Sequence, residues 1–210
     1  MSAFSVPLFA LMSSELFLFS APLCLLLPAR KPAWAYRAAA FAFLLVCEAV
    51  QDPLRRAVIS SGENVAALLA GFALTLCELI VAILIGTKAT VWQAFFIGSS
   101  AYIIQNLITG CTDFLTHLQA ELGILNLPNH TLMFLSLLAV FPLYLVLFVH
   151  PIKRNNLALV SEPQISLAVV AVIFAVIGAD IGIKQVPIDT TGIAPIVALR
   201  IGHATLCVFT

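Results

Sequence analysis

Long apolar runs dominate this sequence and constrain its fold more than any other feature. A helix that spans a membrane needs about 20 mostly apolar residues, and seven segments meet or nearly meet this length. A spanning β-barrel is not expected, because its strands would alternate strictly over about ten residues, whereas these runs are uniformly apolar. The expected spans are 6–27, 34–50, 65–85, 90–118, 132–149, 165–183 and 193–210. We therefore expect an all-α, polytopic transmembrane bundle of about seven spans, with six as the alternative, and no soluble domain.

The composition excludes several classes of protein. Of the 210 residues, 62% are hydrophobic and 10% are charged, whereas soluble domains are about 45–50% apolar and about 25% charged. Lys and Arg together number 10, as do Asp and Glu, so we expect no basic surface and no nucleic-acid partner. The 5 cysteines form no C-x-x-C pair, which argues against a disulfide scaffold or a cysteine metal site. We expect neither a metal nor another cofactor, and the lipid bilayer is the expected partner.

The Lys and Arg residues of the short connections predict the orientation of the bundle. One set of alternate connections carries Arg30, Lys31, Arg37, Lys88, Lys153 and Arg154. The other set carries Arg55, Arg56 and Lys184. Because cytoplasmic connections are enriched in Lys and Arg, we expect a multi-pass protein of the plasma membrane with its N-terminus outside and its C-terminus in the cytoplasm. The sequence ends inside an apolar run, which favours a fragment of a longer protein.

Ionisable side chains inside the expected spans are candidates for function, because they are costly in a bilayer and usually face the bundle interior. These residues include Glu15, Glu48, Glu78, Asp113, Asp180 and Arg200. A guanidinium within the bilayer needs a carboxylate partner. We expect Arg200 to pair with Asp180, Asp113 or Glu48, which lie at compatible depths. Such a pair is either purely structural or part of a ligand site, and the sequence leaves both open.

The segment 90–118 carries the clearest polar pattern. Its polar side chains are Tyr102, Gln105, Thr109, Thr112, Asp113 and Thr116, at spacings of one, three and four residues. At 100° per residue these positions form one stripe of a helix. The stripe either lines a cavity that opens to the outside or forms hydrogen bonds to neighbouring helices.

Two runs in the same segment resemble a known family. They are Val91-Trp92-Gln93-Ala94-Phe95-Phe96 and Ala101-Tyr102-Ile103-Ile104-Gln105-Asn106-Leu107. They resemble the sensor region of bacterial GHKL-type histidine kinases, the relatives of agr-type peptide-pheromone receptors. Glu15 and the basic turn that holds Arg30, Lys31 and Arg37 are also similar. The resemblance implies a homodimeric two-component sensor of six or seven spans, followed by a dimerisation helix and an ATP-binding kinase domain.

The resemblance therefore implies a sensor that detects an extracellular small molecule or peptide. The expected ligand-binding or coupling residues are Tyr102, Gln105, Asp113, Asp180 and Arg200. No catalytic residue is expected, because the chain contains none of the family's phosphoacceptor or ATP-binding motifs. A small transporter, or the substrate-binding subunit of one, is the alternative, because intramembrane carboxylates suit proton or cation coupling. Against the transporter, no internal repeat is evident.

Overall fold

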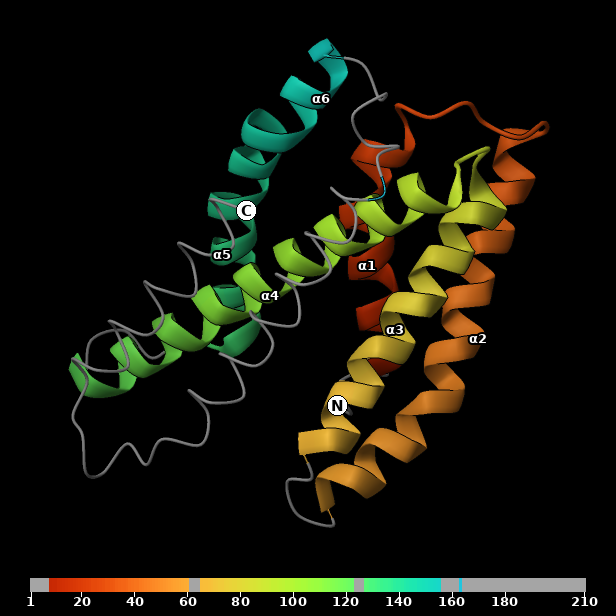
Figure 1. The fold of residues 1–210 in the computed structure, drawn as a ribbon. Helices are drawn as coiled ribbons and strands as arrows, with labels where there is room; N and C mark the ends of the chain where they lie inside the picture. The colour runs from red at the N-terminus through yellow and green to blue at the C-terminus, as the bar shows by residue number, and fades with distance from the viewer. Residues whose placement is uncertain (1–7, 61–64, 123–126, 156–162, 164–210) are drawn as a thin grey trace, which may run out of the picture. The chain divides into compact units, whose positions relative to one another are not determined.

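The computed structural model describes residues 8–60, 65–122, 127–155 and 163, and its regular elements are helices. Figure 1 shows α1 (Leu8–Cys24), α2 (Ala33–Ser60), α3 (Val65–Gly86), α4 (Val91–Leu122), α5 (Asn129–Tyr144), the π-helical turn η1 (Leu145–Val149) and α6 (His150–Asn155). The prediction of an all-α fold is confirmed for this part of the chain. The expected spans 165–183 and 193–210 lie outside the described residues.

Two helices are long and apolar enough to cross a membrane. They are α2, over Ala33–Gln51, and α4, over Val91–Ala120. Shorter apolar stretches occupy Ala70–Gly86 and Asn129–Tyr144. Core helices of soluble proteins can meet the same criteria of length and composition. The described residues thus contain two candidate spans and allow a membrane location, whereas the sequence predicts about seven spans for the whole chain.

Helix α2 extends well beyond its expected end. The expected span ended at residue 50, just before Gln51-Asp52-Pro53, but α2 continues through Pro53 to Ser60, so the predicted end of this helix was wrong. A proline removes one backbone hydrogen bond and crowds the carbonyl four residues earlier. Pro53 is exposed, so the helix accommodates this change at its surface. The apolar part of α2 nevertheless ends at Gln51, close to the expected end of the span.

The described residues form two compact units, and the boundary falls inside α4 between Tyr102 and Ile103. Unit 1 contains α1, α2, α3 and residues 91–102 of α4. Unit 2 contains the rest of α4 with α5, η1 and α6. Helix α4 therefore contributes residues to both units.

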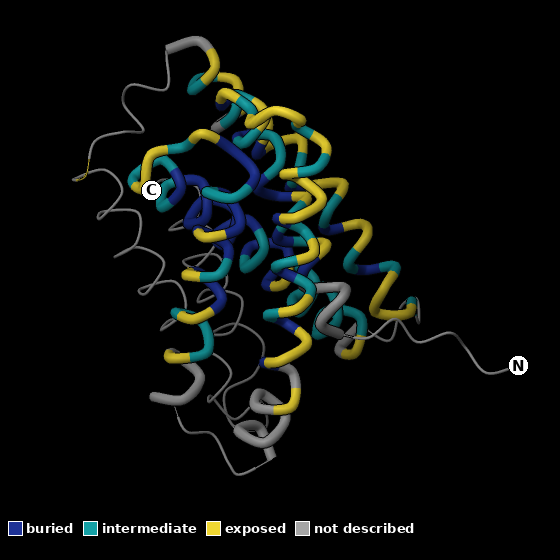
Figure 2. Tube along the Cα trace, turned by 90° about the vertical axis from the view of Figure 1, so that its right-hand side faces the viewer, coloured by how far each residue is buried: buried dark blue, intermediate teal, exposed yellow. Residues whose placement is uncertain are grey.

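In unit 1, α2 packs against both α1 and α3. The Phe17 and Phe41 rings meet edge to face with centroids 5.2 Å apart, and the Ser13 hydroxyl donates to the Leu44 carbonyl over 3.4 Å. Figure 1 shows α2 and α3 side by side along their length. Buried and exposed residues alternate along these helices in Figure 2, so each helix turns one face inward. The largest fully buried apolar side chains of this core are Leu16, Phe19, Leu23, Leu44, Leu79 and Ile97.

Unit 2 contains a helical stretch that changes type after a proline. Pro142 lies inside α5, and η1 follows it directly. Proline has no N–H to give to the carbonyl of Leu138, and the N–H of Leu145 is shared between the carbonyls of Phe141 and Pro142. The connection before α5 is fixed by Gln119. Its side-chain amide donates to the Leu127 carbonyl over 3.1 Å and accepts from the Leu127 N–H over 2.9 Å.

Candidate functional site

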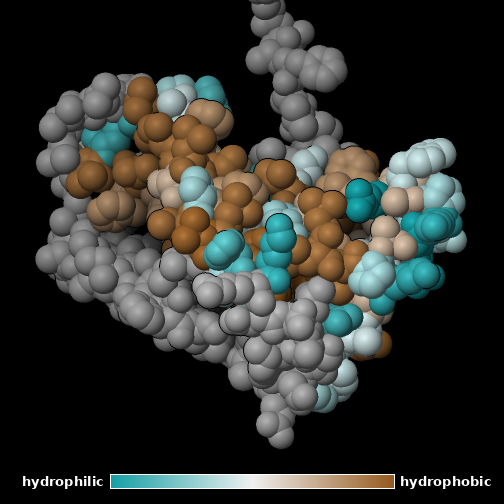
Figure 3. Space-filling view, turned by 90° about the horizontal axis from the view of Figure 1, so that it is seen from above, coloured by the Kyte–Doolittle hydropathy of each residue, from teal (hydrophilic) through white to brown (hydrophobic). Residues whose placement is uncertain are grey.

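The connections between α1 and α2 and between α3 and α4 are bound to each other at one end of unit 1. Arg30 Nε donates to the Thr87 carbonyl over 2.8 Å, and the Lys88 N–H donates to the Pro28 carbonyl over 3.0 Å. Arg30 also lies 5.8 Å from the centroid of the Tyr36 ring. Exposed hydrophilic side chains gather at this end, at the right-hand edge of the view in Figure 3, whereas most of the described surface in that view is hydrophobic.

A cavity of about 250 Å³ lies beside this end, between α1, α2 and α3. Its lining is mostly apolar: Phe17, Ala21, Leu25, Ala40, Leu44, Leu79, Ala82, Ile83 and Gly86. The remaining lining residues are Ser20, Cys24, Arg37 and Thr87. The Ser20 hydroxyl donates to the Phe17 carbonyl of its own helix over 3.1 Å, and the Thr87 hydroxyl, just after α3, donates to the Ile83 carbonyl over 2.7 Å. These two hydroxyls therefore present little free polarity to the cavity.

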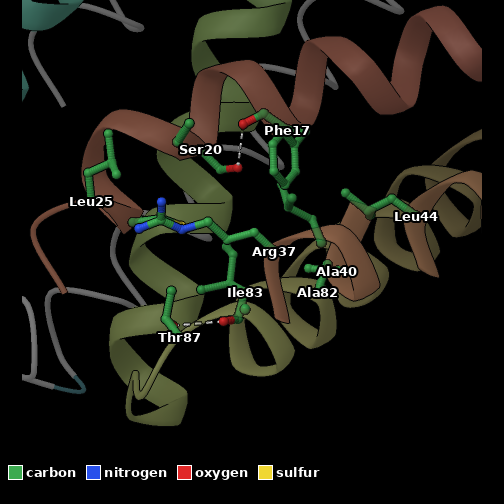
Figure 4. Close-up of a pocket in the computed structure, with 13 residues that line it drawn as sticks. Phe17, Ser20, Leu25, Arg37, Ala40, Leu44, Ala82, Ile83 and Thr87 are labelled. Atoms are coloured by element: carbon green, nitrogen blue, oxygen red, sulfur yellow. Dashed lines mark hydrogen bonds between the residues drawn. The ribbon is translucent and has the colours of Figure 1, made fainter. Parts of the chain in front are cut away.

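Arg37 supplies the one full charge in the lining. In Figure 4 its side chain extends between Leu25 of the first connection and Thr87 of the second. Arg37 is exposed, and its guanidinium is close enough to act electrostatically on the Cys24 thiol. The cavity thus combines an apolar interior with a cation at its open side.

A second feature of unit 1 is a group of buried polar side chains, here called the polar layer. Its members are Glu48, Gln51, Thr75, Ser99 and Tyr102, which are exposed by 5% or less, together with the partly buried Glu78. They come from α2, α3 and α4. Burying polar groups is costly unless they are satisfied, so this concentration is a candidate for function.

The polar layer includes a direct contact between two helices. The Cys47 thiol of α2 donates a hydrogen bond to the Glu78 carboxylate of α3, and Glu48 also acts electrostatically on this thiol. Phe72 of α3 meets Tyr102 of α4 edge to face, with ring centroids 6.0 Å apart. The first contact links α2 to α3, and the second links α3 to α4.

The residues of the expected polar stripe on α4 lie in different environments. Tyr102 is buried in unit 1, whereas Gln105 and Asp113 are partly buried and belong to unit 2. Thr109 is exposed. The hydroxyls of Thr112 and Thr116 donate to carbonyls one turn earlier on the same helix, over 2.8 and 2.9 Å. The hydroxyls of Thr112 and Thr116 thus make local hydrogen bonds within α4.

The three carboxylates that the sequence places inside expected spans differ in burial. Glu48 is 1% exposed, whereas Glu15 and Glu78 are partly buried. Asp180 and Arg200 lie outside the described residues, so the expected ion pair of Arg200 stays a prediction. No group of three or more His, Cys, Asp or Glu residues in the described part of the chain could hold a metal ion.

Arg37 and Ser20 were not expected at a site. The sequence presents Arg37 as one of the cations that predict orientation, and Ser20 as one small residue in an apolar run. Their shared cavity depends on how three helices pack, which no local pattern contains. Only the position of Arg37 in the first turns of α2, next to an apolar run, could have indicated a cation facing a cavity.

The chain matches no family model, no curated protein and no solved structure.

Proposed function

We propose that this chain is a membrane-embedded sensor module whose helices repack when an extracellular ligand binds. The observation that carries the proposal is that polar side chains are buried where apolar side chains at nearby positions of the same helix are exposed. Glu48 is 1% exposed, whereas Val46 and Val50 on the same helix are 63% and 72% exposed. On α3, Thr75 is fully buried, whereas Leu74 is 45% exposed. Soluble proteins favour the reverse arrangement, but a bundle in lipid turns its polar groups inward.

Unit 2 supports the same proposal. Ser136 of α5 is 2% exposed, whereas Phe134, Leu138 and Leu143 are each more than half exposed. The Ser136 hydroxyl donates to the Leu132 carbonyl of its own helix over 3.0 Å, as expected for a hydroxyl in apolar surroundings. An apolar exposed face on α5 agrees with a lipid environment.

The polar layer gives the bundle a means of switching. A ligand shifts a conformational equilibrium only when it binds the two packings with different affinity. Buried polar groups have strong preferences for their partners, so a bundle that contains them favours discrete packings. Helix α4 runs without interruption from Val91 to Leu122 and carries Tyr102, Gln105 and Asp113. We propose that α4 couples the ligand, bound near Gln105 and Asp113, to the polar layer.

The family resemblance supplies the rest of the proposal. The chain would be the input half of a homodimeric histidine kinase, with about seven spans, an outside N-terminus and an inward last span. Asp180 and Arg200 would complete the coupling set as an ion pair. A charge exchange tests this pair. Arg200→Asp is combined in turn with Asp180→Arg, Asp113→Arg and Glu48→Arg. If none of the three double variants restores signalling lost in the single variants, the pair is excluded.

The topology is tested with alkaline phosphatase fusions, because this enzyme is active only outside the cytoplasm. Fusions after residues 62 and 126 should be active, and fusions after residues 31, 88 and 154 should be inactive. Active fusions on both sides of the segment 90–118 would contradict the proposed arrangement, because α4 could not then cross the membrane.

The sensor function is tested by deleting the gene in its source organism and measuring transcripts with and without spent culture medium. We expect the wild-type gene to restore a response that Gln105→Leu and Asp113→Asn abolish. Thr116→Val is the matched control, because the Thr116 hydroxyl bonds its own helix. The DNA after the Thr210 codon should continue in frame into a dimerisation helix and an ATP-binding domain.

Two results would overturn the sensor proposal in favour of the transporter alternative. The first is a stop codon directly after Thr210 without kinase-coding sequence. The second is stoichiometric solute uptake by the purified chain in proteoliposomes, abolished by Glu48→Gln. The buried carboxyl of Glu48 favours this second candidate, because such groups carry protons in membrane transporters.

A further inference from the structure

The cavity between α1, α2 and α3 has the size and lining of a site for one hydrocarbon chain. Its volume of about 250 Å³ lies below the roughly 300–1,000 Å³ of pockets that take drug-sized ligands. Leu44 and Leu79 in its walls are buried, and Ala82 is 3% exposed. A peptide or a nucleotide would need a larger and more polar space.

The open side of the cavity is positively charged. Arg37 lines it, and Arg30, Lys31 and Lys88 are exposed on the adjoining connections. Three carboxylates of unit 1, Glu15, Glu48 and Glu78, lie away from this end. Counted from the helix ends that meet the two connections, each lies about two to four helical turns away. An anionic group is therefore favoured at this end.

Arg37 differs from its neighbour Arg30 in what it contacts. Arg30 donates to the Thr87 carbonyl and lies over the Tyr36 ring. The Arg37 side chain has no hydrogen bond or ion pair with another residue in the described ranges 8–60, 65–122 and 127–155. Its planar fork of donors matches a carboxylate in two-point geometry. One such fork at one narrow cavity fits a single carboxylate.

Aromatic residues place this end of unit 1 at the level of a membrane interface. Trp34 is 76% exposed in the first turn of α2, and Tyr36 follows it with 37% exposure. Tryptophan and tyrosine are enriched at the headgroup level, and Lys and Arg accompany them on the cytoplasmic side. A chain in the cavity would therefore have its polar end among headgroups and its tail among apolar side chains.

We infer that this cavity binds a long-chain fatty acid, with the hydrocarbon chain between α1, α2 and α3 and the carboxylate on Arg37. The inference rests on the membrane location within the proposed function. It adds a ligand on the side opposite to the expected extracellular site. Because the ligand contacts three helices at once, its binding would stabilise one packing of unit 1.

The test uses the full chain in nanodiscs of phosphatidylcholine with a diazirine-bearing palmitic acid as the probe. After illumination, mass spectrometry should place the label on residues 17–25 and 79–87. Palmitic acid should compete with the probe, whereas methyl palmitate, which lacks the charge, should not.

Variants test separately the positive charge of Arg37 and the volume of the cavity. Arg37→Gln should reduce labelling at least tenfold. Lys31→Gln is the control and should leave labelling unchanged, because Lys31 is an exposed cation of the same end that does not line the cavity. Ala82→Leu fills the cavity and should also abolish labelling. If Ala82→Leu does not fold, the position of the label in the wild-type chain tests the same point, because a hydrocarbon chain seated in the cavity labels residues 17–25 and 79–87.

Several results would overturn the inference: label outside the cavity, equal competition by methyl palmitate, or labelling that survives Arg37→Gln. A diazirine phospholipid that labels the cavity in an Arg37-dependent manner would also overturn it, because the occupant would then be a bilayer lipid. The two proposals fail separately. A chain that binds the probe but does not signal contradicts only the sensor function, and a chain that signals without labelling contradicts only the fatty-acid site.

Discussion

The Cys47 thiol of α2 donates a hydrogen bond to the Glu78 carboxylate of α3. The two residues come from the helices that share the most extensive packing in unit 1. The bond therefore links a carboxylate of the polar layer to the neighbouring helix, and its strength can be measured directly.

A double-mutant cycle with Cys47→Ala and Glu78→Ala should give a coupling energy of about 0.6 kcal/mol and at most about 1.7 kcal/mol, the range of hydrogen bonds between membrane helices. Unfolding free energies from SDS titration in mixed micelles provide the measurement. Cys77→Ala is the control, because Cys77 is exposed beside Glu78 on α3. A coupling energy of zero for Cys47 and Glu78 would show that the bond contributes nothing.

Gly98 of α4 lies close to side chains of α3. A Cβ there would lie 3.3 Å from Ile80 Cγ1, 3.6 Å from Leu76 Cδ1 and 3.7 Å from Ile83 Cδ1. Gly98→Leu should therefore lower the free energy of unfolding by about 1–3 kcal/mol through overpacking. Gly71→Leu should change it by about 0.5 kcal/mol or less, because nothing lies within 4 Å of that position. Equal effects at both glycines would contradict the close packing at Gly98.

Thr90 and Gln93 cap the first turn of α4 reciprocally. The Thr90 N–H donates to Gln93 Oε1 over 2.9 Å, and the Gln93 N–H donates to Thr90 Oγ1 over 3.3 Å. This arrangement is a capping box. Thr90→Ala should cost about 1 kcal/mol and speed hydrogen exchange of the amides of residues 91–94, whereas Thr90→Ser should retain protection. Thr112→Ala is the control, since its hydroxyl only bonds the Ile108 carbonyl within α4.

Arg30 should control the opening of the two connections at its end of unit 1. Its bond to the Thr87 carbonyl lies beside the bond from the Lys88 N–H to the Pro28 carbonyl. Arg30→Gln should cost about 1 kcal/mol, and the Lys88 amide should exchange about fivefold faster. Arg30→Lys should not restore protection, because lysine has no Nε–H in that geometry. Unchanged exchange in Arg30→Gln, or a similar increase in Lys31→Gln, would refute this role.

The sequence predicted the starts of three described helices to within one residue, whereas α5 begins three residues before its expected start at 132. Helices α2, α3 and α4 begin within one residue of the expected spans at 34, 65 and 90. Pro32 directly precedes α2, and Thr90 caps α4. The end of α2 was predicted wrongly, because the helix continued past Pro53 with the loss of one backbone hydrogen bond at an exposed position.

The candidate sites were predicted less well, for a different reason. Glu48 and Glu78 were identified correctly as unusual residues, since a carboxylate in an apolar run is visible without a structure. Their contact with Cys47 and the cavity beside Arg37 depend on the rotation of α2 about its axis relative to α1 and α3. A sequence that is apolar on nearly every face of its helices carries little information about that rotation.

The π-helical turn at 145–149 has a consequence for how this region tolerates change. A wider turn accommodates one residue more than an α-helical turn, so η1 absorbs the equivalent of a single-residue insertion without breaking the helix. Residues 150–155 consequently continue the helix with their side chains rotated by about 100° from the positions that an uninterrupted α5 would give them. Deleting one residue within η1 would restore the regular α-helical repeat, and the orientation of Lys153 would change while the helix itself persisted.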